Sequence, residues 1–496
     1  MPSTAKKIFK WASIVIGLIV LVVAGLGAYL YTLIPKPIGK KPVLQAELFS
    51  KPPVEFPVAG KYIFKPATEL AEMIRSKKAT STEIVQEHIN YIKNNNYKTN
   101  AFVWLFEQEA LEAARKADEM VAQGRPLGLL HGVPVSIKEE FAVKGKPHTV
   151  NSEQFQGVVA QENSGIVDAI LREGGVILGT TNVPRILFDV QTFGDIYPPA
   201  NNPYDLTRTP GGSTGGGAAS VASGFSPITV GGDFGGSIRI PASLCGLYGL
   251  KTTEGSMPGH GGFPGTPGNP KYRRMMVAGP LARSIDDLEL AWKAMMNKWP
   301  DQKAKMLEPK LDLKDYRVAY LDEWKFGNDK IAVSKDIKEK LSSLVSALKS
   351  RNVAVEYDQP GDLGQMVAMY RIVAIYTMLE KVPWLFRQFV IRDFKSSDNH
   401  RLDMSEVYER MRDLDSDKYD EILKRREALR SQAEAFFANH DVLILPVTTT
   451  VAIKHNREHN PISVDGTNVD YWDNFLYPVV FNMTGQPSLV IPLGLN

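Results

Sequence analysis

Cysteine and net charge are scarce in this sequence, and each shortage excludes a class of function. The only cysteine among the 496 residues is Cys245, which excludes an internal disulfide and any metal or cluster site built from several cysteines. Lysine and arginine number 58 against 55 acidic residues and are scattered along the chain, so we expect no nucleic acid partner. The phosphate-binding pattern G-x-x-x-x-G-K-S/T does not occur. We therefore predict neither a cofactor nor a metal site.

The composition is that of a globular protein. With 44% hydrophobic and 23% charged residues, the chain has enough apolar side chains to bury a large core. Beyond residue 60 it contains no linker, internal repeat or block of like charge that would mark a domain boundary. We predict one large folded domain over residues 61–496.

One long uncharged run lies near the N-terminus. Residues 11–34 contain no charged side chain, and at a helical rise of about 1.5 Å they would cross a hydrocarbon core of about 30 Å. We predict a transmembrane anchor over 11–34, a basic tail over 1–10 and a proline-rich stalk over 35–60. The result would be a single-pass membrane protein, with lysines on both flanks leaving the side of the folded domain open. The alternative is a cleaved signal peptide, although its apolar region usually spans about 7–15 residues.

Helix and strand patterns alternate along the rest of the chain. Thr80 and Glu83 form a capping-box pattern that predicts the start of a helix. Apolar periodicity and turn residues predict the other elements. The expected helices are 108–123, 167–173, the segment that follows the glycine turn in 211–224, and 416–439; the expected strands are 132–138, 175–179, 442–445 and 487–493. This alternation predicts an α/β fold.

Two glycine-dense segments each place a serine between glycines. They are TPGGSTGGGAAS at 209–220, which contains Ser213, and GGDFGGSIRIPAS at 231–243, which contains Ser237. Glycines let backbone N–H groups approach a ligand closely, but two ordinary tight turns would look the same. Lys138 favours a site, because it closes the apolar run at 132–138 and a lysine at the end of a buried strand is unusual.

Five segments resemble the blocks of the amidase-signature family, in that family's order and at its spacing. They are HGVPVSIKEEF at 131–141, LREGGVILGTTNVP at 171–184, NPYDLTRTPGGSTGG at 202–216, GGDFGGSIRIPASLCGLYGLK at 231–251 and GPLARSIDDL at 279–288. A weaker likeness extends from about residue 65 to the end of the chain. The resemblance implies a single domain with a central mixed, twisted β-sheet covered by helices on both faces. It implies Ser237 as the nucleophile, Ser213 as a bridging serine after a cis peptide bond at Gly212, and Lys138 as the base.

The chemistry of these three residue types is consistent with amide hydrolysis. A serine hydroxyl is a weak nucleophile unless a neighbouring base takes its proton, and a lysine can be that base only as a neutral amine. A bridging serine could pass the proton to lysine and later return it to the departing amine. The predicted oxyanion donors are the backbone N–H groups of Phe234, Gly235, Gly236 and Ser237.

Three further residues are predicted to support the site. Asp233 and Arg239 are expected to brace the glycine loops, because buried charges are usually paired. Thr214 retains the hydroxyl of the serine that is common at its position in the family. Gly232, in contrast, lacks the hydroxyl that a serine or threonine usually supplies there. Relatives usually continue beyond the position of Leu493, so a truncated C-terminus is also an expectation.

Two rival interpretations use the same residues differently. Residues 211–215 fit G-x-S-x-G, which would make Ser213 the nucleophile of an α/β-hydrolase esterase, but no hydrophobic strand precedes it. His455 and His459 fit H-x-x-E-H, an inverted zinc motif that needs one helix to carry both histidines. Pro461 and the threonine-rich segment before Val451 argue against such a helix. Neither interpretation gives Lys138 a role.

The resemblance leaves two substrate groups open within the family. One comprises the glutamine-using subunits of tRNA amidotransferases, and the other the membrane-anchored hydrolases of fatty acid amides, which the chain resembles most. The predicted anchor, the apolar candidate pocket residues Ile186, Leu187, Phe188 and Phe475, and a membrane-dipping cap at 366–394 favour a fatty acyl amide substrate and a membrane partner. A glutamine or small-amide amidase is the alternative, with Asp473 near the position where glutamine-binding enzymes carry an aspartate. Two buried core helices would equally explain 366–394, and a homodimer stays open.

Overall fold

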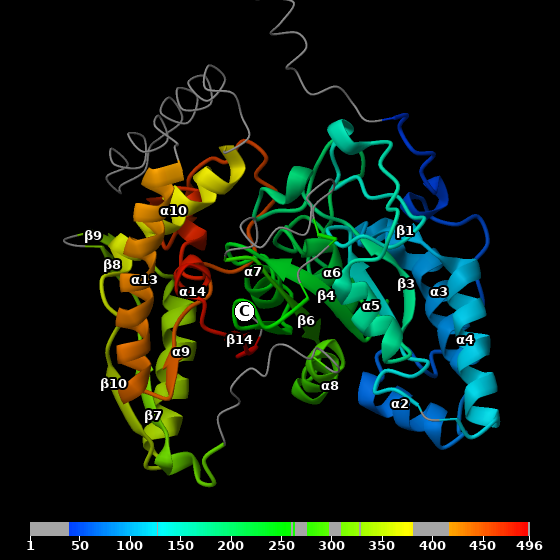
Figure 1. Ribbon diagram of the computed structural model, residues 1–496, viewed down its shortest axis with the longest axis horizontal. Coiled ribbons are helices and arrows are strands. Elements are labelled where there is room, and N and C mark those ends of the chain that lie inside the picture. The colour runs from blue at the N-terminus through cyan, green and yellow to red at the C-terminus, as the bar shows by residue number, and fades with distance from the viewer. Residues whose placement is uncertain are drawn as a thin grey trace, which may run out of the picture.

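A computed structural model shows the arrangement of the chain (Figure 1). The described residues are 39–125, 127–258, 261–262, 275–296, 309–326, 329–379 and 416–494. The predicted basic tail and the predicted anchor at 11–34 lie outside these residues. Residues 39–60, within the predicted stalk, lie against the body: Leu48 is buried, and the Gln45 side chain accepts from the backbone N–H of Leu105 at 2.7 Å.

The predicted membrane localisation is wrong. A helix needs about 20 consecutive apolar residues to cross a bilayer. No helix within the described parts of the chain is both long enough and apolar enough to do so.

The centre of the molecule is a mixed sheet of seven strands in the order β1-β3-β2-β4-β6-β5-β14. The strands are β1 Phe102–Leu105, β2 Pro134–Lys138, β3 Val176–Thr181, β4 Ile228–Asp233, β5 Tyr248–Lys251, β6 Val277–Ala282 and β14 Ser488–Val490. β2 runs parallel to β3 and β4, and the other neighbours pair antiparallel. Val135 and Ile137 of β2 lie opposite Ile228 and Val230 of β4. The predicted α/β fold with a central mixed sheet is confirmed.

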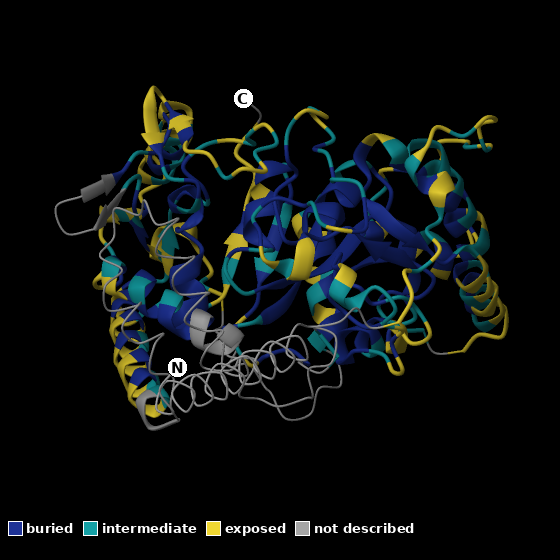
Figure 2. Cartoon of the chain, turned by 90° about the horizontal axis from the view of Figure 1, so that it is seen from above, coloured by how far each residue is buried: buried dark blue, intermediate teal, exposed yellow. Residues whose placement is uncertain are grey.

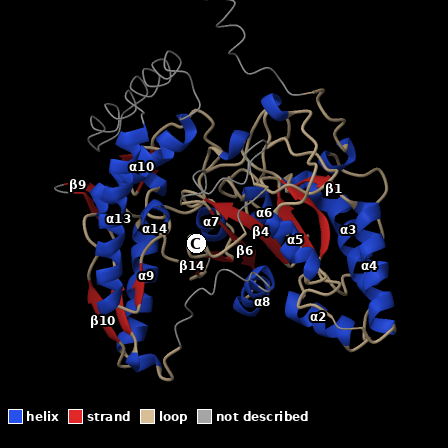
Figure 3. Ribbon diagram, in the orientation of Figure 1, coloured by secondary structure: helices blue, strands red, loops and turns tan. Residues whose placement is uncertain are grey.

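Helices lie on both faces of this sheet (Figure 3). They are α2 Ala67–Arg75, α3 Ser81–Thr99, α4 Glu107–Ala122, α5 Gly165–Arg172, α6 Gly215–Ala222, α7 Arg239–Leu244 and α8 Ile285–Met296. Side chains of a strand alternate between its faces. Ile228 and Val230 of β4 therefore join α5 and α8 in one core, whereas Thr229 faces α6 at Gly217. Figure 2 shows burial concentrated along the central strands and exposure along the outer helices.

A second, smaller layer of helices and strands lies beside the central sheet, at the left of Figure 1. Its three parallel strands, in the order β10-β7-β11, are β7 Arg317–Tyr320, β10 Ala354–Tyr357 and β11 Val442–Ile444. Its helices are α9 Lys335–Lys349, α10 Leu363–Leu379, α13 Ser416–Asn439 and α14 Val479–Thr484, and two hairpins pair β8 Trp324–Phe326 with β9 Asp329–Ile331 and β12 Ile462–Val464 with β13 Thr467–Val469. α10 packs against α13 and α14.

The segment predicted as a membrane-dipping cap belongs in part to the core. Within α10, Met366, Val367, Ile372 and Val373 are buried in the largest apolar cluster of the described residues. The cap interpretation is therefore wrong for this part, and the core-helix interpretation holds. Residues 380–394 of the predicted cap lie outside the described residues.

Candidate active site

Lys138 ends β2, between β3 and β4 in the middle of the sheet. Its side chain is 1% exposed. The Nζ atom donates to Ser213 Oγ at 2.9 Å and to the backbone oxygen of Gly232 at 3.1 Å, and it lies 2.6 Å from Glu140 Oε2. The central strand thus delivers a buried amine directly to one of the two predicted catalytic serines.

Ser213 lies in a glycine turn immediately before α6. Gly211 has φ +88°, in the left-handed region that favours glycine. A Cβ on Gly212 would lie 2.5 Å from the backbone oxygen of Gln191, so the close approach of two loops also requires glycine there. The Gly212–Ser213 peptide bond is cis. No strand directly precedes Ser213, so this segment lacks the strand–turn–helix geometry of a nucleophile elbow.

Ser237 lies in the loop between β4 and α7 and is partly buried. Its backbone oxygen accepts from the N–H of Thr214 at 3.1 Å, which holds the two glycine segments side by side. Among the described hydrogen bonds, none joins the Ser213 and Ser237 hydroxyls. Catalytic hydrogen bonds in enzymes are often long or poorly aligned until a substrate binds.

The predicted oxyanion donors are not equivalent. The N–H of Gly236 donates to Asp233 Oδ1 at 2.9 Å and is already engaged. Phe234, Gly235 and Ser237 are therefore the better candidates. A Cβ on Gly235 would lie 2.3 Å from the hydroxyl oxygen of Tyr370, so α10 packs directly against this loop.

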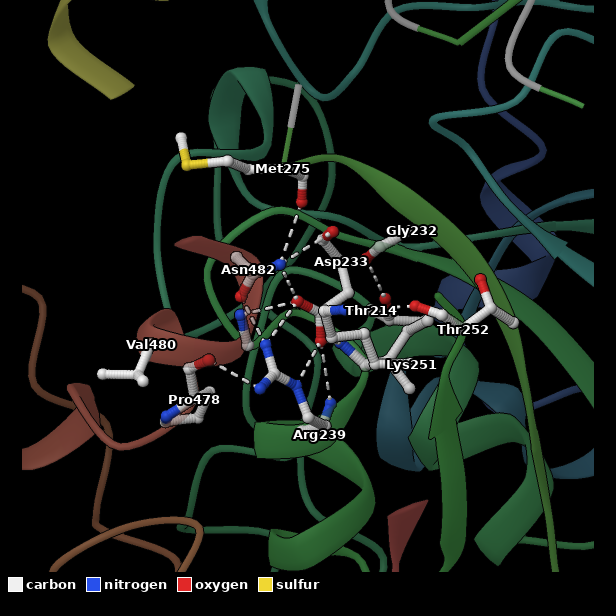
Figure 4. Close-up of polar contacts among 12 residues, drawn as sticks. Thr214, Gly232, Asp233, Arg239, Lys251, Thr252, Met275, Pro478, Val480 and Asn482 are labelled. Carbon is white, nitrogen blue, oxygen red and sulfur yellow. Dashed lines mark hydrogen bonds and ion pairs between the residues drawn. The ribbon is translucent and has the colours of Figure 1, made fainter. Parts of the chain in front are cut away.

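Asp233 and Arg239 form a buried bidentate ion pair beneath the serine loop (Figure 4). Arg239 Nε and Nη2 donate to the two carboxylate oxygens at 3.0 and 2.8 Å. Asn482 Nδ2 on α14 donates to Asp233 Oδ1 at 2.9 Å, and Arg239 Nη1 donates to the Pro478 oxygen at 2.6 Å. Burial alone would raise the pKa of Asp233, but Arg239 and Asn482 outweigh it and hold the pKa well below its usual range. This geometry suits the predicted bracing role.

Thr214 packs against the start of the other glycine segment. Its hydroxyl donates to the Gly232 oxygen at 3.4 Å. A Cβ on Gly231 would lie 2.6 Å from the Thr214 methyl carbon. Thr214 therefore contacts the second glycine segment directly.

The predicted pocket residues differ in exposure. Ile186 and Phe188 are exposed, at 39% and 45%, and Leu187 between them is partly exposed. The Phe188 ring lies 5.9 Å from the Trp472 ring, whereas Phe475 is buried in the apolar cluster around α10.

Asp473 and the two histidines of the metal interpretation each have their own polar contacts. Asp473 is buried and lies 3.4 Å from Arg371 Nη2 of α10. His455 and His459 lie in a loop instead of a helix, where His455 contacts Asn201 and His459 contacts Asp189. Across the described residues, no group of three or more histidine, cysteine or acidic side chains could hold a metal ion.

Sequence reasoning missed three residues that contact the site: Glu140, Tyr370 and Asn482. The only signals were weak. Glu140 is the second acidic residue after Lys138, and the unusual glycine at 232 marked a local departure without indicating its cause. Tyr370 and Asn482 come from distant parts of the chain, so no local pattern connects them to Ser237.

Known proteins match most of the chain. The sequence pattern of the family described as Amidase matches residues 83–496. A glutamyl-tRNA(Gln) amidotransferase subunit of Clostridium botulinum (strain Eklund 17B / Type B) is 27% identical, covering 86% of this chain and 90% of the relative. The solved structure of fatty acid amide hydrolase has a TM-score of 0.70 at 26% identity, covering 86% of this chain and 72% of the other. A bacterial aryl acylamidase, with a TM-score of 0.70 at 23% identity over 88% of this chain and 91% of the other, shows a shared fold.

Proposed function

Since the chain belongs to the amidase family and is an enzyme of carbon–nitrogen amide bonds, we propose that it hydrolyses small carboxamides through Ser237, Ser213 and Lys138. The observation that carries this proposal is the 2.9 Å hydrogen bond between Lys138 and Ser213 beneath the Ser237 loop. This contact places a buried amine against a serine hydroxyl at the end of a central strand, as a base that accepts a serine proton requires. The rival assignment of Ser213 as the nucleophile would leave Ser237 without a role.

The reaction follows from this order of groups. The Ser237 hydroxyl attacks the amide carbonyl carbon while its proton passes to Ser213, and the Ser213 proton passes to neutral Lys138. The negative oxygen is then stabilised by backbone N–H donors of Phe234, Gly235 and Ser237, each worth about 2.7–4 kcal/mol in comparable sites. Lys138 returns its proton through Ser213 to the nitrogen, the C–N bond breaks, and water releases the acid from Ser237.

L-Glutamine is the first substrate that we propose. The support is the likeness to an amidotransferase subunit, which covers 90% of that relative's length. A primary carboxamide on a short chain also makes no demand for a long apolar channel. A fatty acyl amide is the second candidate, because the exposed apolar side chains of Ile186 and Phe188 could contact an acyl chain.

Ammonia release from L-glutamine, propionamide and oleamide by the purified full chain tests both the mechanism and the substrate. We expect Ser237→Ala and Lys138→Ala to lower kcat/KM at least about 1,000-fold. The matched control is Ser243→Ala, which removes an exposed serine hydroxyl from α7 and should leave the rate unchanged. Retained activity in Ser237→Ala would exclude the mechanism, whereas a rate that rises steeply with acyl length would replace glutamine by a fatty acyl amide.

A further inference from the structure

Glu140 is a buried carboxylate in direct contact with the base. The backbone N–H of Phe141 donates to the Lys138 oxygen at 3.0 Å, which closes a tight turn after β2. This turn brings the Glu140 side chain back onto Lys138, where Oε2 lies 2.6 Å from Nζ and the two side chains are 4% and 1% exposed. Within the described residues Oε2 accepts no hydrogen bond, and its ion pair is with the Lys138 amine.

Gly232 leaves the space that this carboxylate occupies. A Cβ on Gly232 would lie 2.2 Å from Glu140 Oε2 and 2.5 Å from Oε1. Gly232 is absent from the glycines with positive φ, so its backbone conformation does not itself require glycine. The glycine is needed for space. A side chain at position 232 and the Glu140 carboxylate would occupy the same space. The glycine at 232 therefore allows the carboxylate to contact Lys138.

This pair holds one proton that can take two positions. As an ammonium, Lys138 has three N–H groups, and within the described part of the chain its polar contacts are Ser213 Oγ, the Gly232 oxygen and Glu140. Lys138 can act as a base only after giving one proton away. An ammonium with a carboxylate, and an amine with a carboxylic acid, have the same net charge. A shift of the proton within the pair therefore creates no additional buried charge.

We propose that Glu140 holds the proton that Lys138 gives up before it acts as the base, which makes Glu140 a proton-holding residue that works through Lys138. The inference rests on the proposed function. Lys138 first transfers a proton to Glu140 and becomes an amine. It then takes the Ser213 proton as Ser237 attacks, and later returns that proton through Ser213 to the leaving nitrogen. Finally the Glu140 proton moves back to Lys138, so every proton is accounted for.

The other ionisable side chains near Glu140 have contacts of their own. His148 Nε2 contacts the backbone oxygen of Glu140 at 2.9 Å, and burial lowers the pKa of His148 to about 4. The Glu139 side chain accepts from Tyr197 and Thr149, and burial raises its pKa to about 7. Asp233 is paired with Arg239.

The rate at which a fluorophosphonate labels Ser237, measured as a function of pH, tests the inference without knowledge of the substrate. With Glu140 present, neutral Lys138 arises by proton transfer within the pair, so the rate should be flat between about pH 6 and 8. Glu140→Gln has nearly the same shape but cannot take the proton. Its labelling should therefore be slower than that of the wild type and should increase with pH, because the neutral amine can then form only by loss of a proton to solvent.

Two controls separate the possible failures. Glu87→Gln removes another buried carboxylate, which accepts from Tyr62, and should keep the flat profile. The double variant Glu140→Ala with Gly232→Ser fills the vacated space. Its labelling rate should change with pH in the same way as that of Glu140→Gln, so the inference can still be tested if Glu140→Gln does not fold. Parallel profiles for wild type and either Glu140 variant would overturn the inference. Wild-type labelling that is absent, or that survives Ser237→Ala, would instead overturn the proposed function.

Discussion

The substitution Arg239→Met should destabilise the protein strongly, because it leaves Asp233 buried without its counter-charge. Asp233 is fully buried, and Arg239 supplies two of its hydrogen bonds at 2.8 and 3.0 Å. The N–H groups of Gly236 and Ile238 and the Asn482 amide would still bind the carboxylate. Removal of one partner of a buried pair typically costs about 3–5 kcal/mol. We expect a loss of that size in the free energy of unfolding at neutral pH.

The loss should also depend on pH in a defined direction. With Arg239 present, the folded-state pKa of Asp233 is depressed, so the pair stabilises the fold above the ordinary pKa of an aspartate, and this contribution is lost as pH falls. Without Arg239, fewer partners oppose the effect of burial, so the pKa of Asp233 should rise and the variant should lose less stability as pH falls. The difference in unfolding free energy between wild type and variant should therefore become smaller as the pH is lowered from about 7 to 4.

Urea unfolding followed by tryptophan fluorescence at these pH values measures both effects. Lys293→Met is the control, because Lys293 pairs with Glu289 on the surface, where both side chains are more than half exposed. That variant should unfold at the wild-type urea concentration. A difference below about 1 kcal/mol for Arg239→Met, or one that does not change with pH, would refute the account of the pair.

Two further changes have expected outcomes that follow from burial and space. Burial lowers the pKa of His88 to about 4, so the unfolded state binds a proton below about pH 6.5 while the folded state does not. The wild type should therefore lose up to about 3 kcal/mol more unfolding free energy than His88→Met when the pH is lowered from 7 to 4.5. Unfolding free energies of both proteins at these two pH values measure this, and an equal pH dependence would contradict it. Gly232→Ala should lower the free energy of unfolding by about 1–3 kcal/mol, because the added methyl group would overlap with Glu140. Gly262→Ala is the control, because its methyl group would lie in open space and should not change this free energy. Equal unfolding free energies for the two variants would contradict the overlap.

The parts of the fold that follow from the sequence are those with strong local signals. The capping box at Thr80 and Glu83 is present at the start of α3, and the predicted strand at 132–138 is β2. β7 and β10 were not predicted, because each has four residues and β10 is largely exposed, which leaves no clear alternation. α10 was ambiguous because its apolar residues surround the helix. Such a pattern cannot distinguish a lipid-facing surface from a protein core.

The site residues differ in the same way: some could be predicted from local sequence, and others come together only in the folded chain. Lys138, Ser213 and Ser237 lie in segments that carry their own signals, glycine density and an apolar strand. Glu140 required knowledge of the turn that folds it back, and of the space at Gly232, which lies 92 positions later in the chain. The engagement of Gly236 by Asp233 was likewise invisible, because backbone hydrogen bonds in an irregular loop have no sequence pattern.

The contacts of residues 478–490 with the site have a consequence for how the enzyme folds during synthesis. Asn482 and Pro478 bind the Asp233–Arg239 pair, and β14 completes the sheet beside β5. A ribosome-bound chain that has exposed Lys138, Ser213 and Ser237 but not residues 478–490 still lacks these contacts. The order of translation therefore delays completion of the serine loop until residues 478–490 have emerged, and a shorter nascent chain carries the reactive groups without these contacts.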